Sequence, residues 1–267
     1  MSFNYHELTM NEPRDSPGRR KQYLVICTIG VAVFGNSLIN SGFFNEVKIS
    51  EGVFPGGEFV YKSDFRDYAA SASMIRSVAE EGSIKTEQYD DLLYTFYLDD
   101  TSVIPSGKQR FSGGMLLDKQ QTKEFKPTLM ALNEQRPGYE EGASATALYQ
   151  NLLHYESCSV PSVDAAVANF PFTNGFVSAL IHDFKVFPAM LKYAREHGEE
   201  GNHPVIATTC SIKQGMCTHY VPLVKGSKFL LGKPTTKDYL DSLPKIDGGI
   251  DWADVYKGLK KVIPFLK

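Results

Sequence analysis

The chain has 267 residues, of which 42% are hydrophobic and 12% aromatic, with a formal net charge of −3. This composition supplies enough apolar side chains for a packed core and excludes a wholly disordered chain. The slightly acidic balance excludes a generally basic nucleic-acid binder, so we expect no nucleic-acid partner. The four cysteines are too few for a disulfide-stapled scaffold.

The most unusual stretch lies near the N-terminus, where no charged residue occurs from Gln22 to Asn45. As a helix it is long enough to cross a bilayer core of about 30 Å. Its apolar side chains contribute roughly −3 to −7 kcal/mol to insertion, which polar residues near its end reduce. We predict a single-pass transmembrane anchor over residues 22–45, behind a disordered tail over residues 1–21.

Two other interpretations of this stretch stay open. The basic cluster Arg19–Lys21 and the apolar run Tyr23–Gly35 also have the form of a cleaved signal peptide. A buried core helix is the third interpretation, although the run is apolar on all sides rather than along one stripe.

The orientation of the anchor is open as well. The positive-inside rule would keep the basic N-terminal residues in the cytosol and send the main domain into the lumen. The sequence contains no N-x-S/T glycosylation sequon, which points toward a cytosolic domain.

Residues 46–224 show one order of elements twice: strand, helix, strand, strand. Alternating apolar and polar residues predict the first strand, and Gly82 ends the helix that follows it. Gly113-Gly114 indicates a bulge or a close backbone approach in the last strand. The expected elements of the first unit are Glu58–Phe65, Tyr68–Glu81, Leu92–Leu98 and Arg110–Leu117.

Between the units, charges, prolines and glycines over residues 119–144 predict a loop, followed by a short helix over Ala145–Tyr155. In the second unit, Asn174 is positioned to cap the helix and Pro188 to kink or split it. The expected elements of that unit are Val163–Phe172, Asn174–His197, His203–Ile212 and Met216–Leu223.

The predicted fold class is therefore α+β, with two tandem strand–helix–strand–strand units behind one N-terminal transmembrane helix. Residues 46–224 form the main domain. Residues 225–267 are expected as a basic linker that leads to an amphipathic C-terminal helix over Asp251–Leu266.

A family resemblance rests on six short stretches in chain order. They are Val47–Tyr61, Tyr94–Pro105, Gly113–Leu116, Asn169–Thr173, Phe187–Tyr193 and Tyr220–Leu223. With the anchor in front, this layout resembles the GyrI-like domain family, and most closely the testis-expressed, membrane-anchored ER-phagy receptors of animals. The resemblance implies a single-pass protein of the endoplasmic reticulum membrane with a cytosolic GyrI-like domain.

GyrI-like domains that sense ligands bind cations with a buried glutamate, and the hydrolytic branch relies on an acid in the second unit. Ala207 stands at the position that we align with this acid, and no Asp or Glu occurs between Glu200 and Asp238. Without a carboxylate, the groove lacks a general base and a counter-charge for a cation. We therefore predict a protein that is not an enzyme, with no catalytic residues and no cofactor.

The predicted function is that of a non-enzymatic membrane adaptor or receptor, in selective autophagy of the endoplasmic reticulum by resemblance. The alternative is a membrane-tethered GyrI-like protein that binds or hydrolyses a small molecule. For a small apolar ligand, the candidate groove residues are Tyr61, Tyr97, Phe111 and Ala207.

The implied partners are the lipid bilayer and ubiquitin-like autophagy modifiers, which the receptor family binds through an aromatic-x-x-aliphatic motif. Trp252 and Val255 are the candidate motif, although they also fit the amphipathic C-terminal helix. Tyr89–Leu92 and Tyr5–Leu8 have the same shape and are weaker candidates, in a loop and in the N-terminal tail.

We predict no metal site, because none of the usual Cys/His zinc spacings occurs. Cys210 and Cys217 are interpreted as ordinary buried thiols with only His219 near them in sequence. His182, His197 and His203 are interpreted as surface or structural residues, like His219.

Overall fold

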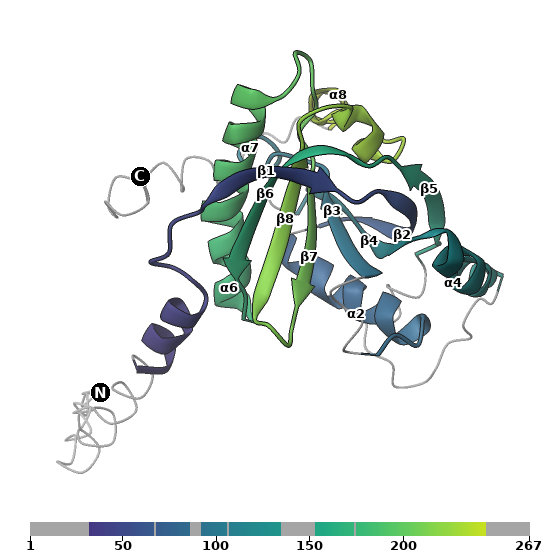
Figure 1. Cartoon of the computed structure of the whole chain (residues 1–267), viewed down its shortest axis with the longest axis horizontal. Helices are drawn as coiled ribbons and strands as arrows, with labels where there is room; N and C mark the ends of the chain where they lie inside the picture. Colours follow the sequence, from purple (N-terminus) through teal and green to yellow (C-terminus); the bar gives the residue numbers. More distant parts are fainter. Residues whose placement is uncertain are drawn as a thin grey trace, which may run out of the picture.

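The computed structural model describes residues 32–66, 68–85, 92–105, 107–134, 153–173 and 175–243. Eight antiparallel strands form one curled sheet, with the long helices against it (Figure 1). The strand order is β1-β6-β8-β7-β3-β4-β2-β5. The strands are β1 Ile49–Phe54, β2 Gly57–Phe65, β3 Leu93–Tyr97, β4 Arg110–Leu117, β5 Glu156–Val160, β6 Val163–Pro171, β7 Ile206–Ser211 and β8 Met216–Pro222.

The predicted α+β class is confirmed, and so is the repeated order of elements. The first unit is β2, the turn η1 (Tyr68–Ala70), α2 (Ser71–Glu81), β3 and β4. The second is β6, α6 (Phe176–Ile181), α7 (Phe187–His197), β7 and β8. The units join where β3 pairs with β7, a contact centred on Phe96 opposite Ala207.

Two strands that we did not predict complete the sheet at its edges, and each belongs to the opposite half. β1 precedes the first unit but pairs with β6 of the second, whereas β5 precedes the second unit but pairs with β2 of the first. From the centre of the sheet to its edges, the strand orders of the two halves are thus β3-β4-β2-β5 and β7-β8-β6-β1. This arrangement gives the sheet a pseudo-twofold symmetry.

Alternation along β4 separates two packed faces. Phe111, Met115 and Leu117 lie against α2, α4 or the helices of the second unit, and we call this the helix face. Leu116 belongs to the core cluster of the opposite face. The predicted close approach at Gly114 is confirmed, since a Cβ there would lie 2.2 Å from the Val60 carbonyl oxygen.

The second-unit helix is split, as Pro188 predicts. A π-helical turn, His182–Val186, separates α6 from α7, and Pro188 stands in the first turn of α7. Proline is tolerated in a first helical turn, where backbone N–H groups lack helical partners anyway. Asn174, the expected cap, lies outside the described residues.

The loop predicted over residues 119–144 is wrong at its start, because helix α4 covers Lys119–Ala131. Asp118 accepts hydrogen bonds from the Gln120 and Gln121 backbone N–H groups, and the Gln121 side chain accepts one from the Asp118 N–H. This capping box starts a helix that Pro127 would otherwise disfavour. Fully buried Leu129 packs the helix on the core. Within the expected helix 145–155, the described residues 153–155 are not helical.

Part of the expected basic linker instead belongs to the folded body. The turn η4 (Gly226–Leu230) inserts Phe229 into the core, and helix α8 (Thr236–Ser242) follows. The Arg110 guanidinium donates to the Pro234 carbonyl at 2.9 Å and to the Asp99 carboxylate at 2.6 Å. The C-terminal helix expected over 251–266 lies outside the described residues.

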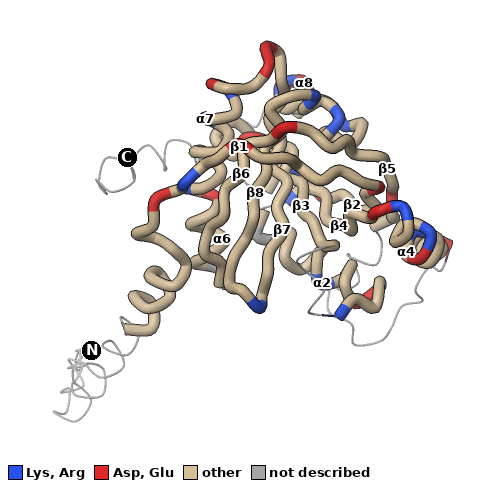
Figure 2. The backbone as a smooth tube through the Cα atoms, in the orientation of Figure 1, with Lys and Arg blue, Asp and Glu red and all other residues tan. Residues whose placement is uncertain are grey.

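The predicted anchor is described only in its second half. Residues 32–40 are helical and project from the body (Figure 1), and this helix bears no charged residue (Figure 2). Just beyond it, the Ser41 hydroxyl is hydrogen-bonded to Thr173 at 2.6 Å, and Lys185 donates to the Phe43 carbonyl at 2.7 Å. None of the helices within the described ranges is both long and apolar enough to cross a bilayer.

Candidate functional site

The four predicted groove residues lie on opposite faces of the sheet. Tyr61 and Ala207 belong to the core cluster away from the helices, whereas Phe111 and Tyr97 pack on the helix face. The two sets cannot line one groove, because successive side chains of a strand point to opposite sides. Neighbouring positions of one strand can both be aromatic, as Phe96 and Tyr97 are, so the sequence alone did not show which residues share a face.

The face that bears Ala207 is filled by aromatic rings of the chain itself, and we call it the aromatic face. Phe54 contacts four other rings edge-on, including that of Phe229 at a centroid distance of 5.0 Å. Phe229 and Ala207 are both 0% exposed. The aromatic face comprises Phe54, Phe59, Tyr61, Tyr94, Phe96, Tyr220 and Phe229.

A polar border closes one side of the aromatic face. The Tyr61 hydroxyl donates to the Glu156 carboxylate at 3.3 Å, and the Lys233 ammonium lies 3.0 Å from the same carboxylate. Burial, aided by Cys158 and Glu156, raises the pKa of Tyr61 above its usual value. Tyr61 is therefore a neutral hydrogen-bond donor in this border near pH 7.

An open hollow of about 300 Å³ lies at the end of the β7–β8 hairpin. Thr218 donates a hydrogen bond of 2.8 Å to Asn169 across its wall. Uncharged hydroxyl and amide groups suit hydrogen bonds to a neutral ligand. The lining residues are Asn169, Thr209, Ser211, Gln214, Met216 and Thr218.

A second hollow of about 320 Å³ lies between α7 and α8. Its walls are largely apolar, and an ion pair between Arg195 and Asp100 stands at its side. His203, which the sequence left as a surface or structural residue, contributes to this lining.

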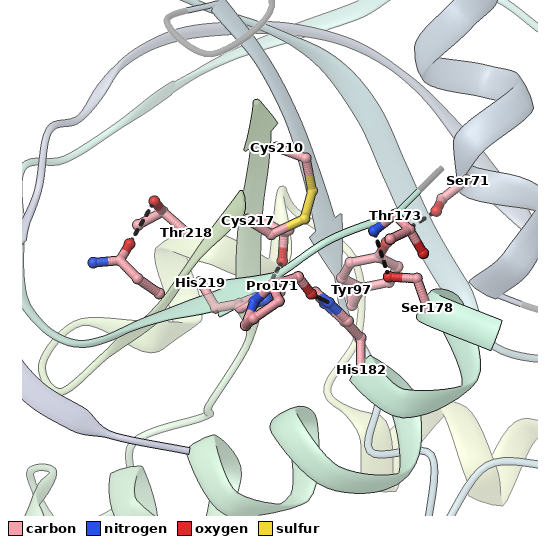
Figure 3. The surroundings of a disulfide bond; sticks show 12 residues. Ser71, Tyr97, Pro171, Thr173, Ser178, His182, Cys210, Cys217, Thr218 and His219 are labelled. Carbon is pink, nitrogen blue, oxygen red and sulfur yellow. Dashed lines mark hydrogen bonds between the residues drawn. A yellow bond between two sulfur atoms is a disulfide. The ribbon is translucent and has the colours of Figure 1, made fainter. Parts of the chain in front are cut away.

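The prediction of free thiols at Cys210 and Cys217 is wrong, because the two form a disulfide across β7 and β8 (Figure 3). They stand directly opposite each other in the strand register. The sequence contained a usable signal: a four-residue turn after Ser211 places both cysteines at one hairpin position.

Beside the disulfide, the structure brings together two histidines that are far apart in sequence. His182 comes from the π-helical turn and His219 from β8, with ring centroids 4.9 Å apart (Figure 3). Burial lowers the pKa of His182 and, more strongly, that of His219, to which the nearby His182 also contributes. Both imidazoles are therefore neutral near pH 7.

Ligand atoms of His182, Cys217 and His219 all lie within 4.8 Å of one another, and all three residues are buried. The sequence predicted no metal site, and this grouping of three potential ligands was not expected from it. Sequence reasoning missed it because His182 reaches the strand only through packing of the helix on the sheet.

Of the three candidate autophagy-modifier motifs, the structure describes only one residue, Leu92. Trp252 and Val255 lie outside the described residues, as do Tyr5 and Leu8. Leu92 of the Tyr89–Leu92 stretch is 3% exposed and packs in the core of the first unit. An anchor buried in this way is not available to a partner, which disfavours that stretch.

Comparisons with known proteins found solved structures of partly similar shape, but no match by sequence. No family model matches the sequence, and no curated protein matches it. The EcmrR C-terminal domain aligns with 66% of this chain and 96% of its own, at 9% identity and a TM-score of 0.37. An uncharacterized conserved protein from Listeria innocua aligns with 67% and 94%, at 9% identity and a TM-score of 0.37.

A structure described as a hydrolase from Listeria innocua aligns with 69% of this chain and 97% of its own, at 10% identity and a TM-score of 0.34. At such scores the likeness in shape is partial, and function has to be argued from the residues of the site.

Proposed function

We propose that this protein is a non-catalytic GyrI-like adaptor or receptor domain that its N-terminal segment tethers to the endoplasmic reticulum membrane. The observation that carries the non-catalytic part is the aromatic face. Where a GyrI-like sensor or hydrolase would present an acid in an open groove, this chain has a fully buried Ala207 in the same core cluster as its own Phe229. A face occupied by the chain itself suits a scaffold better than a reaction chamber.

Binding and turnover measurements test this part. We expect the full chain to show no micromolar binding of a lipophilic quaternary cation and no hydrolysis of an activated ester such as p-nitrophenyl acetate. Either activity in the native protein would overturn the proposal and favour the small-molecule alternative.

A cavity variant tests whether the chain itself is the occupant. Phe229→Ala removes a fully buried ring and should cost about 3–5 kcal/mol of stability. If the variant folds, the apolar cavity should bind benzene, which the native chain excludes. Leu240→Ala, at a side chain that is 38% exposed, is the matched control and should gain no binding.

The membrane tether is supported by apolar side chains that remain uncovered on the 32–44 segment. Val33, Phe34, Ile39 and Phe44 are 64%, 57%, 62% and 75% exposed. Water-exposed apolar side chains grouped in this way mark a surface that a membrane or partner covers. Leu38 and Phe43 turn inward and pack on the domain, so the segment is fixed at the body.

The tether is tested by extraction of microsomes with alkaline carbonate. The native chain should stay in the pellet, whereas Val33→Asp/Phe34→Asp should appear in the supernatant. Each charge near the helix centre costs about 2.5–3.5 kcal/mol, so the two together offset most of the insertion energy. Phe65→Asp/Val103→Asp alters side chains that are 58% and 45% exposed elsewhere and should remain in the pellet. Extraction of the native chain would contradict a membrane anchor.

The autophagy role is the most specific part of the proposal and rests on the family resemblance. We expect Trp252 and Val255 to anchor the chain on a ubiquitin-like modifier by adding a strand to its sheet edge. Trp252→Ala/Val255→Ala should abolish pull-down of such modifiers, and Tyr5→Ala/Leu8→Ala should leave it unchanged. Equal pull-down by native chain and first variant would remove this part while leaving the tether intact.

A further inference from the structure

The cluster around the disulfide has the composition of a soft-metal site. On β8, Cys217 and His219 point to the helix face from alternate positions, and His182 meets them from the π-helical turn (Figure 3). Thiolate sulfur with imidazole nitrogen is the ligand set that zinc prefers. Ligand atoms around a tetrahedral zinc lie about 3.3–3.8 Å apart. The ligand atoms here are separated by up to 4.8 Å, so the side chains have to move by about an ångström to bind zinc.

The hydrogen bonds of the two histidines leave one nitrogen of each available. His182 Nε2–H donates to the Pro171 carbonyl at 2.9 Å, which leaves Nδ1 with a lone pair. His219 Nδ1 is hydrogen-bonded to the Thr208 hydroxyl at 2.9 Å. A carbonyl or hydroxyl on the second nitrogen is the outer-shell arrangement that orients a metal-binding imidazole.

The remaining nitrogen of His219 is the strongest single sign of a ligand. Nε2 is buried and has no hydrogen-bond partner among the described residues, and His219 is 0% exposed. A buried polar atom without a partner costs about 1–3 kcal/mol. A metal ion at this point would satisfy it.

The disulfide blocks the third ligand, because a sulfur engaged in a disulfide offers no thiolate. We propose that reduction of Cys210–Cys217 converts this cluster into a Zn²⁺ site that comprises the Cys217 thiolate, His182 and His219. The disulfide form is then the closed state of a redox-gated metal site.

The reducing step uses two equivalents of a small thiol. Cys217 is 1% exposed, whereas Cys210 is only partly buried, so the first thiolate attacks the Cys210 sulfur. The S–S bond breaks, Cys217 leaves as the thiolate, and a mixed disulfide remains on Cys210. A second thiol attacks the external sulfur, which releases Cys210 and an oxidised thiol dimer. Zinc then binds the Cys217 thiolate.

Zinc titration of the full chain in a Cys27→Ser/Cys158→Ser background tests the proposal, since that background keeps only the two gating thiols. The oxidised chain should bind no Zn²⁺ above background, and the chain reduced by a phosphine should bind one equivalent. Substituting Co²⁺ should produce a thiolate-to-cobalt charge-transfer band. Equal binding before and after reduction would overturn the redox gate.

Cys210→Ser is the decisive variant, because it frees Cys217 without any reductant. It should bind one Zn²⁺ under oxidising and reducing conditions alike, and failure to do so would overturn the proposal. Cys217→Ser and His182→Gln should each lose at least tenfold in affinity and the cobalt spectrum should change. His197→Gln, at a histidine on the exposed side of α7, should bind like the parent.

Thr208→Val tests the outer shell while sparing the ligands. Loss of an outer-shell partner lowers metal affinity by about 10–100-fold, and we expect a value in that range. Circular dichroism of each variant establishes that it is folded. Zinc affinity in a folded His182→Gln equal to that of the parent would contradict the assigned ligands.

Discussion

The partly buried environment of Cys158 on β5 sets the reactivity of its thiol. Partial burial, with nearby Glu58 adding to its effect, raises the pKa of this thiol from 9.0 to about 11. A rise of two units reduces the thiolate about 100-fold, and the greater nucleophilicity of the more basic thiolate recovers about tenfold. Cys158 should therefore be a slow thiol in the folded chain.

Alkylation by iodoacetamide at pH 8 measures this effect. In a Cys27→Ser chain with the disulfide intact, Cys158 is the remaining thiol, and it should react about tenfold more slowly folded than in urea. Equal rates in the two states would contradict the raised pKa.

Gly114 is a residue whose lack of a side chain the sheet requires. A Cβ at this position would meet the Val60 carbonyl oxygen at 2.2 Å and the Tyr61 Cα at 2.6 Å. Because both contacts are backbone of the paired strand, Gly114→Ala should cost more than about 2 kcal/mol in urea unfolding. Gly175→Ala is the control, since its Cβ would meet nothing within 4 Å in the described part of the chain.

At the scale of elements, the Asp99–Arg110 pair fastens the segment from η4 to α8 onto the first unit. The Asp99 carboxylate is fully buried, accepts from the Arg110 backbone and guanidinium, and receives a hydrogen bond from Thr236 at 3.2 Å. The Arg110 guanidinium also lies over the Tyr239 ring of α8 at 4.0 Å. Residues 225–243 of the expected linker are thereby attached to the folded body.

Asp99→Asn should therefore destabilise the chain by about 3–5 kcal/mol in urea unfolding, because it leaves Arg110 buried without its counter-charge. Asp100→Asn changes the next residue, whose partner Arg195 is exposed, and should cost less than about 1 kcal/mol. Similar losses from both substitutions would contradict the structural role of the buried pair.

The turn η4 is held between two residues of left-handed backbone conformation. Lys225 and Leu231 have φ angles of 55° and 54°, which cost a non-glycine residue about 1–2 kcal/mol each. The exposed Lys225 can be replaced without loss of core packing, so Lys225→Gly should raise the midpoint of thermal unfolding. A lower midpoint would show that its backbone is not strained.

Prediction from sequence succeeded where local signals and tertiary packing agree. Strand β4 was expected over its observed range, Arg110–Leu117, and Pro188 marked the break between α6 and α7. β1 and β5 were missed because they are edge strands with charged or small residues, stabilised by pairing rather than by pattern. Helix α4 was missed although Asp118 and Gln121 form a recognisable capping box, because Pro127 dominated the interpretation.

The candidate site was less predictable than the fold. Ala207 was correctly expected on a strand, but only the structure places it in one buried core cluster with Phe229 from the expected linker. The cysteine pairing was accessible from the hairpin turn, whereas the approach of His182 depends on helix packing. Long-range contacts of this kind leave no periodicity in the sequence.

For the whole molecule, the redox state of Cys210 and Cys217 should match the compartment in which the domain lies. A cytosolic domain would meet reducing thiols, whereas a lumenal one would keep the disulfide. We expect protease to digest a C-terminal tag in intact microsomes and Cys210 and Cys217 to be alkylated without added reductant. A protected tag would contradict the cytosolic placement.

The exchange of edge strands has a consequence for synthesis on the ribosome. When the first unit has emerged, β1 still awaits β6 and β2 still lacks β5 beside it. The nascent first half therefore exposes an unpaired strand and an open sheet edge, the features by which partly made chains aggregate. Completion of the sheet therefore has to wait for translation of the second half.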